Sequence, residues 1–174
     1  MSANVDILFE PITVKDVSLP NRIVMAPMTR RKCPGNAPGD DVAAYYRRRA
    51  EGGVGLIITE GVFVEHKAAN GYDGVPNIYS DAALAGWRRV VEEVHAGGAK
   101  IIPQIWHVGA QRVRGIEPDR EVPGYAPSAV ATGDHEVPVA MSKKDIEDCI
   151  AAYAEAAANA KKVGFDGVEI HGAH

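Results

Sequence analysis

Residues 56–61 read Leu56-Ile57-Ile58-Thr59-Glu60-Gly61, an apolar run that ends in polar residues and a glycine. A strand that is buried on both faces is nearly continuous in apolar residues, as in a parallel sheet covered by helices. Folds of this class gather ligand-binding groups at the carboxyl ends of their strands. Three further runs have the same form: Ile23-Val24-Met25-Ala26-Pro27-Met28-Thr29, Ile101-Ile102-Pro103-Gln104-Ile105-Trp106 and Gly167-Val168-Glu169-Ile170-His171-Gly172-Ala173-His174. The pattern predicts parallel strands near 22–29, 55–64, 100–106 and 165–171, with a site at one end.

Amphipathic stretches between these runs predict helices near 40–52, 80–97 and 142–164. Asp40 and Asp41 suit a helix N-terminus, and Ser142 with Asp145 forms a capping-box pattern. The apolar faces follow the helical period. They are Val42, Tyr46, the stem of Arg49 and Ala50 in the first stretch; Leu84, Trp87, Val90, Val91 and Val94 in the second; and Ile146, Cys149, Ile150, Tyr153, Ala157 and Ala160 in the third.

The element order β-α-β-α-β-α-β fits two α/β folds with right-handed crossovers. A doubly wound sheet normally has a glycine-rich phosphate loop after its first strand, and the loop after Thr29 lacks G-x-G-x-x-G spacing. A TIM (β/α)8 barrel needs about 250 residues. We therefore expect residues 1–174 to supply the first four βα units of such a barrel. Residues 1–20 are expected to form an N-terminal hairpin, and 108–141 a long capping loop without helical period.

Composition narrows the function classes. The 174 residues are 46% hydrophobic and 24% charged, with a formal net charge of −4. A nucleic-acid-binding protein would need a basic stripe, and no stretch approaches the ~18 apolar residues of a membrane span. We expect a cytoplasmic protein with no nucleic-acid or membrane partner, and oligomer formation is left open. The two cysteines, Cys33 and Cys149, form no metal or disulfide framework.

Side chains two apart on a strand share a face, so the polar groups at the strand ends are expected to meet. The set offers hydrogen-bond donors and lacks a nucleophile–base pair or a carboxylate pair. A carboxamide presents both a donor and an acceptor, which matches an imide edge such as that of a flavin. The expected members are Thr29, the Gly61 amide, Gln104, Trp106, His171 and His174.

At these positions the sequence resembles the Old Yellow Enzyme family of FMN-dependent ene-reductases (NADH:flavin oxidoreductases). The matching segments lie in family order and cover the chain from about residue 7. They are Asn21-Arg22-Ile23-Val24-Met25-Ala26-Pro27-Met28-Thr29-Arg30, Ile58-Thr59-Glu60-Gly61, Gly71-Tyr72, Pro103-Gln104-Ile105-Trp106-His107 and Val168-Glu169-Ile170-His171-Gly172-Ala173-His174.

The resemblance implies an FMN-containing barrel and a role for each matching residue. Thr29, His171 and His174 would be catalytic, and the histidines would donate hydrogen bonds to the activating oxygen of the substrate. The implied FMN-binding residues are Pro27, Met28, Thr29, Gly61, Gln104 and His171. The implied substrate-binding residues are Trp106, Tyr72, His171 and His174.

The resemblance also implies the reaction and the partners. NADH or NADPH would reduce the flavin, and the reduced flavin would pass hydride to an enone or nitroalkene in a ping-pong cycle. The family's proton-donating tyrosine and phosphate site come later in the family pattern than His174. We therefore expect the C-terminal half of the barrel as a partner, and little activity from residues 1–174 alone.

Two other functions are compatible with the sequence. The chain could be a non-catalytic half-barrel that serves as an assembly module, or belong to a flavin enzyme of the dienoyl-CoA reductase or trimethylamine dehydrogenase type. His171 and His174 could bind zinc, but no third ligand is placed beside them, so no metal is expected. Glu169 is expected to pair with a cation in the other half and receives no catalytic role. Four further histidines are expected at the surface or in loops: His66, His95, His107 and His135.

Overall fold

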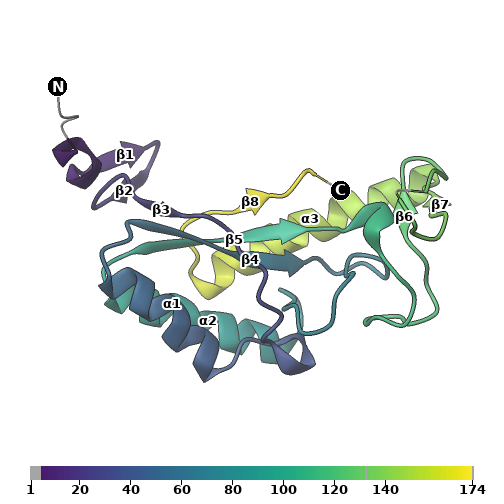
Figure 1. Cartoon of the computed structure of the whole chain (residues 1–174), viewed down its shortest axis with the longest axis horizontal. Helices are drawn as coiled ribbons and strands as arrows, with labels where there is room; N and C mark the ends of the chain where they lie inside the picture. The colour runs from purple at the N-terminus through teal and green to yellow at the C-terminus, as the bar shows by residue number, and fades with distance from the viewer. Residues whose placement is uncertain (1–4, 132, 174) are drawn as a thin grey trace.

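A computed structural model describes residues 5–131 and 133–173, and its centre is a four-stranded parallel sheet (Figure 1). The strand order is β3-β4-β5-β8, with no reversal of direction. This order confirms the predicted succession of strands and excludes a strand-order switch within the described sheet. The strands are β3 (Val24–Met25), β4 (Leu56–Phe63), β5 (Lys100–Trp106) and β8 (Glu169–Ile170).

The two outer strands are much shorter than predicted. β3 pairs with β4 through Val24 and Met25, and β8 pairs with β5 through Glu169 and Ile170. Each has one neighbouring strand among the described residues, so hydrogen bonds hold it along one edge. The side chains of Val24 and Ile170 are 47% and 66% exposed. The sheet is therefore that of a half-barrel with two open edges.

The three predicted helices are confirmed as α1 (Asp40–Glu51), α2 (Asp81–Ala96) and α3 (Lys143–Val163). Ser80 caps α2 by accepting a hydrogen bond from the amide of Ala83. Ser142 and Asp145 form the predicted reciprocal capping box at the start of α3. Gly164 ends α3 in the left-handed conformation, at φ 102°.

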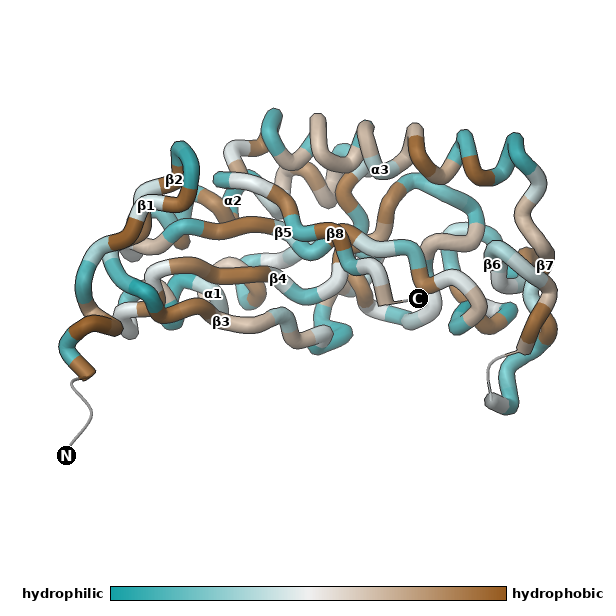
Figure 2. The backbone as a smooth tube through the Cα atoms, turned by 90° about the horizontal axis from the view of Figure 1, so that it is seen from above, coloured by the Kyte–Doolittle hydropathy of each residue, from teal (hydrophilic) through white to brown (hydrophobic). Residues whose placement is uncertain are grey.

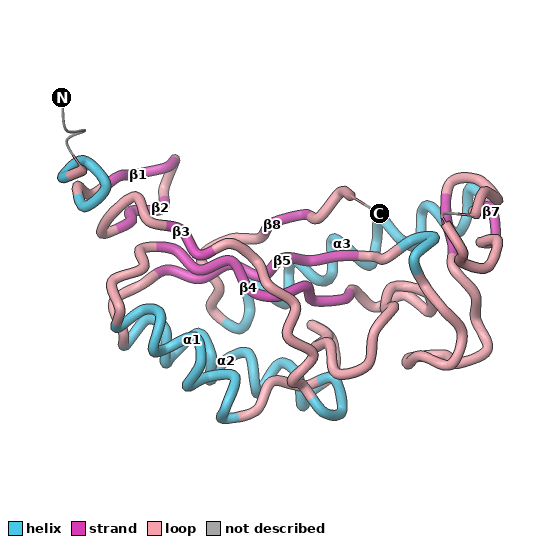
Figure 3. The backbone as a smooth tube through the Cα atoms, viewed as in Figure 1, coloured by secondary structure: helices cyan, strands magenta, loops and turns pink. Residues whose placement is uncertain are grey.

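The hydrophobic core lies between the sheet and the helices. α1 and α2 run side by side beneath β4 and β5, and α3 flanks the sheet (Figure 3). In α2, the predicted face is buried at Trp87, Val90, Val91 and Val94. Viewed from above, apolar stretches follow the strands (Figure 2). Within the described residues, no helix combines the length and apolar character needed to cross a membrane.

The predicted apolar face of α3 is wrong in its first turns. Ile146 and Ile150 are 44% and 64% exposed, whereas the buried residues are small and lie on a neighbouring stripe. α3 contacts α2 and β5 through this stripe, because alanines let the backbones approach closely. The buried positions are Ala152, Ala156, Ala160 and Val163.

Of the two remaining segments, residues 1–20 contain the predicted hairpin, and the capping role of loop 108–141 stays a prediction. Within residues 1–20, β1 (Ile12–Val14) and β2 (Val17–Leu19) form an antiparallel hairpin after a short 3₁₀ helix, Asp6–Phe9. The long loop 108–141 contains a 3₁₀ turn (Gly109–Gln111) and two short strands, β6 (Tyr125–Ala126) and β7 (Val139–Ala140). The guanidinium of Arg112 is buried beneath this loop and donates to the carbonyl oxygens of Asn70, Ile116, Glu117, Asp119 and Val122.

Candidate functional site

Three predicted site residues lie together at the carboxyl ends of adjacent strands. The Gly61 amide on β4 donates to the hydroxyl of Thr29 at 3.4 Å. Gly61 is also the register partner of Gln104 on β5, directly after an irregularity in the β4–β5 ladder. The Thr59 hydroxyl accepts the Gln104 backbone amide at 3.2 Å and spans this irregularity. The predicted convergence of Thr29, Gly61 and Gln104 is therefore present.

Gln104 lies on the face of β5 opposite Ile101 and Ile105, which are 0% and 1% exposed in the core cluster. Trp106, at the end of the strand, also belongs to that cluster and is 5% exposed. Side chains alternate between the faces of a strand, so Gln104 does not point into the helix layer. Gln104 is nevertheless 7% exposed, because neighbouring side chains cover it.

Gln104 is held by a partner that sequence reasoning did not assign. Its Nε2 donates to Oε1 of Glu169 on β8 at 2.8 Å, and the two residues are register partners. Glu169 was expected to pair with a cation, and here it accepts from an amide. Both residues lie near the carboxyl ends of neighbouring strands, which is the signal that could have suggested the pair.

Aromatic rings form one wall of the site. The Trp106 ring lies 6.0 Å, centroid to centroid, from both Tyr72 and His171. A Cβ added to Gly61 would lie 2.5 Å from ring carbons of Trp106, so only glycine allows this indole to pack there. Thr29, Arg31, Tyr72 and Trp106 line a pocket of about 300 Å³. The predicted substrate residues Tyr72, Trp106 and His171 are thus neighbours.

The remaining predicted residues flank this group in sequence. Pro27 is half-buried and Met28 is 63% exposed on the segment that leads to Thr29. His171 is half-buried, and its backbone amide donates to the carbonyl oxygen of Ile105 at 3.0 Å. His174 lies outside the described residues, so the predicted pairing of His171 with His174 stays a prediction.

A buried ion pair beside Thr29 was missed by the sequence analysis. Glu60 is 0% exposed and accepts from the backbone amide of Arg30 at 3.3 Å and from its Nη2 at 3.0 Å. Burial raises the pKa of Glu60, and the Arg30 charge opposes that rise. The Arg30 guanidinium also lies 3.6 Å from the Tyr45 ring centroid. These contacts fix the backbone that follows Thr29. The acidic Glu60 at the end of one apolar run and the basic Arg30 at the end of another could have suggested this pair.

His107 lies in the loop after β5, which is one of the two expected locations, and it is buried there. Its Nε2 lies 2.8 Å from Nδ1 of His66, and its Nδ1 accepts from the Gly109 amide at 3.0 Å. Burial lowers the pKa of His107 to about 3, with smaller effects from His66 and Arg112. The strand end after Trp106 is thereby tied to the loop that carries His66.

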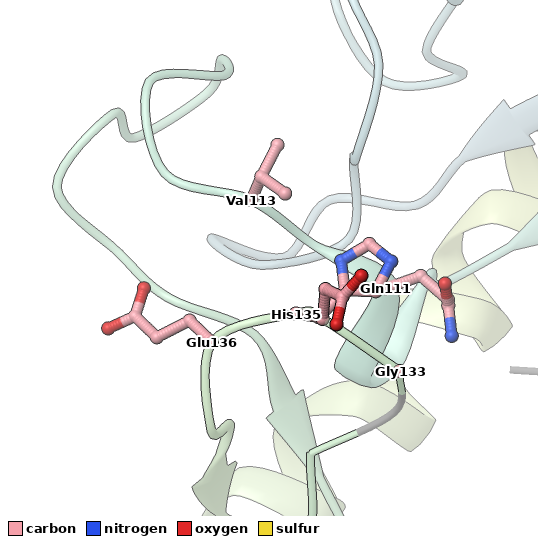
Figure 4. A pocket seen from close by; sticks show the side chains of 6 residues that line it. Gln111, Val113, Gly133, His135 and Glu136 are labelled. Carbon is pink, nitrogen blue, oxygen red and sulfur yellow. The ribbon is translucent and has the colours of Figure 1, made fainter.

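A larger cavity lies in the long loop and shares no residue with the site above. It has a volume of about 640 Å³, and Glu136 extends away from the other labelled side chains (Figure 4). Glu136 is paired with Arg114 at 3.0 Å. The cavity is lined by Gln111, Val113, Gly133, Asp134, His135 and Glu136.

The site fits a flat heterocycle with hydrogen-bonding edges better than it fits a metal ion. A threonine hydroxyl and a carboxamide lie at the carboxyl ends of neighbouring strands, with an aromatic wall beside them. These groups suit an imide edge, so the residues present fit the isoalloxazine ring of FMN. In the described part of the chain, no three His, Cys, Asp or Glu side chains gather as metal ligands.

A family model and the similar proteins of known name point to the same family. The model of the NADH:flavin oxidoreductase / NADH oxidase family matches residues 7–174. The chain is 36% identical to putative 12-oxophytodienoate reductase 4 of Oryza sativa subsp. japonica, covering 96% of this chain and 45% of that protein. It is 40% identical to a chanoclavine-I aldehyde reductase of Penicillium roqueforti, over 96% and 46% of the two chains.

Solved structures agree with this comparison. The structure of morphinone reductase superimposes with a TM-score of 0.88 at 38% identity, covering 94% of this chain and 47% of that one. Another structure of morphinone reductase is a complex with tetrahydroNAD and superimposes with a TM-score of 0.85. These structural neighbours are (β/α)8 barrels, so the expected fold class is confirmed. The chain spans about half the length of the curated relatives it matches.

Proposed function

The chain belongs to the NADH:flavin oxidoreductase / NADH oxidase family, and from this premise we propose that it works in an FMN-dependent ene-reductase. The proposed reaction reduces an activated C=C bond, as in an enone or nitroalkene, with NADH or NADPH as the reductant. The three relatives reported above are all named reductases, which supports this class. A cytoplasmic location is also proposed, from composition alone.

One observation carries the proposal. Thr29, Gly61 and Gln104 come from three segments far apart in sequence and meet at the carboxyl ends of parallel strands. Trp106 and His171 stand beside them. This arrangement supports the proposal that Thr29, Gly61 and Gln104 bind a flavin edge and that His171 binds a substrate oxygen.

In this proposal the protein's residues hold and orient the reactants. Bound FMN supplies hydride transfer, which no side chain of the chain can perform. Thr29 and Gln104 hold the ring by hydrogen bonds, and Pro27, Met28 and Gly61 contribute backbone groups. Trp106 and Tyr72 shape the substrate side and exclude water from it.

His171 and His174 are proposed to donate hydrogen bonds to the carbonyl or nitro oxygen of the substrate. Negative charge develops on that oxygen when hydride reaches the β-carbon. A donor that is already oriented stabilises this charge, and losing one such donor typically slows catalysis by about 10²–10³-fold.

The test uses the full-length protein. Purified protein should show a flavin absorption band, and reduced flavin should be reoxidised by 2-cyclohexenone in stopped-flow absorbance. The His171→Ala variant should slow that step by about 10²-fold, less if His174 compensates. Flavin reduction by NAD(P)H should change less, because no charge develops on an enone oxygen in that step.

Two results would contradict the proposal. A purified protein that binds no flavin removes the ene-reductase function and favours a non-catalytic assembly module. Wild-type reoxidation in the His171→Ala/His174→Ala variant removes the histidines from the substrate site. His135→Ala, a histidine in the long loop that shares no contact with the site, is the matched control.

A further inference from the structure

We propose that Glu169 is a positioning residue that fixes which end of the Gln104 carboxamide faces the flavin. This inference rests on the proposed function, because it concerns how the same site recognises FMN. Glu169 would act through Gln104 and would not take part in the chemical step.

The orientation follows from the chemistry of the pair. Gln104 Nε2 lies 2.8 Å from Glu169 Oε1 across the β5–β8 ladder. An ionised carboxylate only accepts hydrogen bonds, whereas an amide both donates and accepts. The nitrogen of Gln104 must therefore face Glu169, and its carbonyl oxygen must face elsewhere. A reversed amide would set two acceptors against each other at a largely buried position, which is costly.

This orientation leaves a defined pattern for a ligand. One N–H of the amide is taken by Glu169, so the carbonyl oxygen and the second N–H remain to be used. In the part of the chain that the structure describes, the carbonyl oxygen of Gln104 makes no hydrogen bond. The pyrimidine edge of a flavin carries an N–H between two carbonyl oxygens. An acceptor beside a donor complements that edge, whereas a freely rotating amide would match it only part of the time.

The experiment is a series at position 169 in the full-length apoprotein, with FMN affinity measured by quenching of flavin fluorescence. Glu169→Gln allows both orientations of Gln104 and should weaken FMN binding about twofold. Glu169→Lys places a donor against the amide, turns its oxygen toward position 169, and should weaken binding by at least about tenfold.

Charge alone predicts the opposite sign for the lysine variant. FMN is an anion, so a nearby ammonium would strengthen its binding if Glu169 acted only through its field. The same substitutions are therefore repeated in a Gln104→Ala background. If Glu169 acts through Gln104, neither substitution weakens FMN binding in the Gln104→Ala background. The double-mutant cycle then shows that positions 104 and 169 are coupled in FMN binding.

The outcomes separate the inference from its premise. A wild-type apoprotein that binds no FMN overturns the proposed function. FMN binding by the wild type together with equal losses in both backgrounds, or with tighter binding by Glu169→Lys, overturns the role of Glu169. Melting temperatures show whether each variant folds. If the lysine variant does not fold, Glu169→Gln alone tests the role of Glu169. Its twofold loss of FMN affinity should disappear in the Gln104→Ala background, and a loss that persists there overturns the role. Glu155→Lys, on the exposed side of α3, is the matched charge control.

Discussion

At the scale of single residues, the His66–His107 pair shows how hydrogen bonding fixes a protonation state. Nδ1 of His107 accepts from Gly109, so its proton is assigned to Nε2, which then donates to Nδ1 of His66. Nδ1 of His66 also accepts from the Ala68 amide at 3.3 Å. Neither ring can take up a proton on its occupied nitrogen without losing a hydrogen bond. Burial lowers the pKa of both rings, and that of His107 to about 3.

A pH dependence of stability follows from His107. Its pKa in the folded protein lies below the ordinary 6.5, so the unfolded chain binds the proton more tightly. The contribution of His107 to the free energy of unfolding is therefore fully present above about pH 6.5 and is lost as the pH drops toward 3. At pH 5 the loss from this residue is about 2 kcal/mol. Urea unfolding at pH 7 and pH 5 measures this loss. It should shrink in His107→Gln and persist in His135→Gln, and an unchanged loss in His107→Gln would contradict the assignment.

At the scale of secondary-structure elements, local signals placed the helices well. Ser142 and Asp145 were recognised from their spacing, and the box closes with Asp145 accepting from the Ser142 amide at 2.9 Å. The face that α3 buries was misjudged at Ile146 and Ile150. Both the observed and the expected stripes have helical period, and only contact with α2 and β5 selects the alanine stripe.

The capping box gives a prediction for α3. Ser142→Ala removes the acceptor for the Asp145 amide, which lies 3.2 Å from the serine hydroxyl. Loss of an N-cap side chain costs about 1 kcal/mol, so the free energy of unfolding should fall by that amount. Urea denaturation measures it, and hydrogen exchange should become faster in the first turn of α3. Ser128→Ala, in the exposed long loop, should have no effect; an equal effect of the two substitutions would argue against the capping role.

At the scale of the whole molecule, the half-barrel sheet has an open edge at β8, and the helix α3 has exposed apolar side chains in its first turns. Val168 and Ile170 at β8 are 36% and 66% exposed, and Ile146 and Ile150 are exposed on α3. A pocket of about 310 Å³ is lined by Ala157 and Lys161 of α3 and by residues 165–168, the segment that leads into β8. Exposed apolar side chains at an open strand edge are typical of an interface. We infer that the second half of the barrel covers them in the full-length protein.

The edge of β8 provides a matched comparison. Ile170 and Val130 are both 66% exposed, but Ile170 lies on β8 and Val130 lies in the long loop. In the full-length protein, Ile170→Asp should lower the free energy of unfolding by about 3 kcal/mol or more, because a charge would be buried without a partner. Val130→Asp should change it by less than about 0.5 kcal/mol. Equal, small effects in urea denaturation would mean that β8 stays uncovered.

The sequence by itself determined the parallel strands, their order, the three helices, the capping box of α3, and the hairpin. These features depend on periodicity and on capping residues a few positions apart, which act within one element. It also identified the residues that meet at the site, since Thr29, Gly61 and Gln104 each follow an apolar run. Only the tertiary structure decided the pairs Arg30–Glu60, His66–His107 and Gln104–Glu169, whose members are 30, 41 and 65 residues apart. Such pairs depend on strand register and on how a loop returns over the sheet, and no local pattern specifies either.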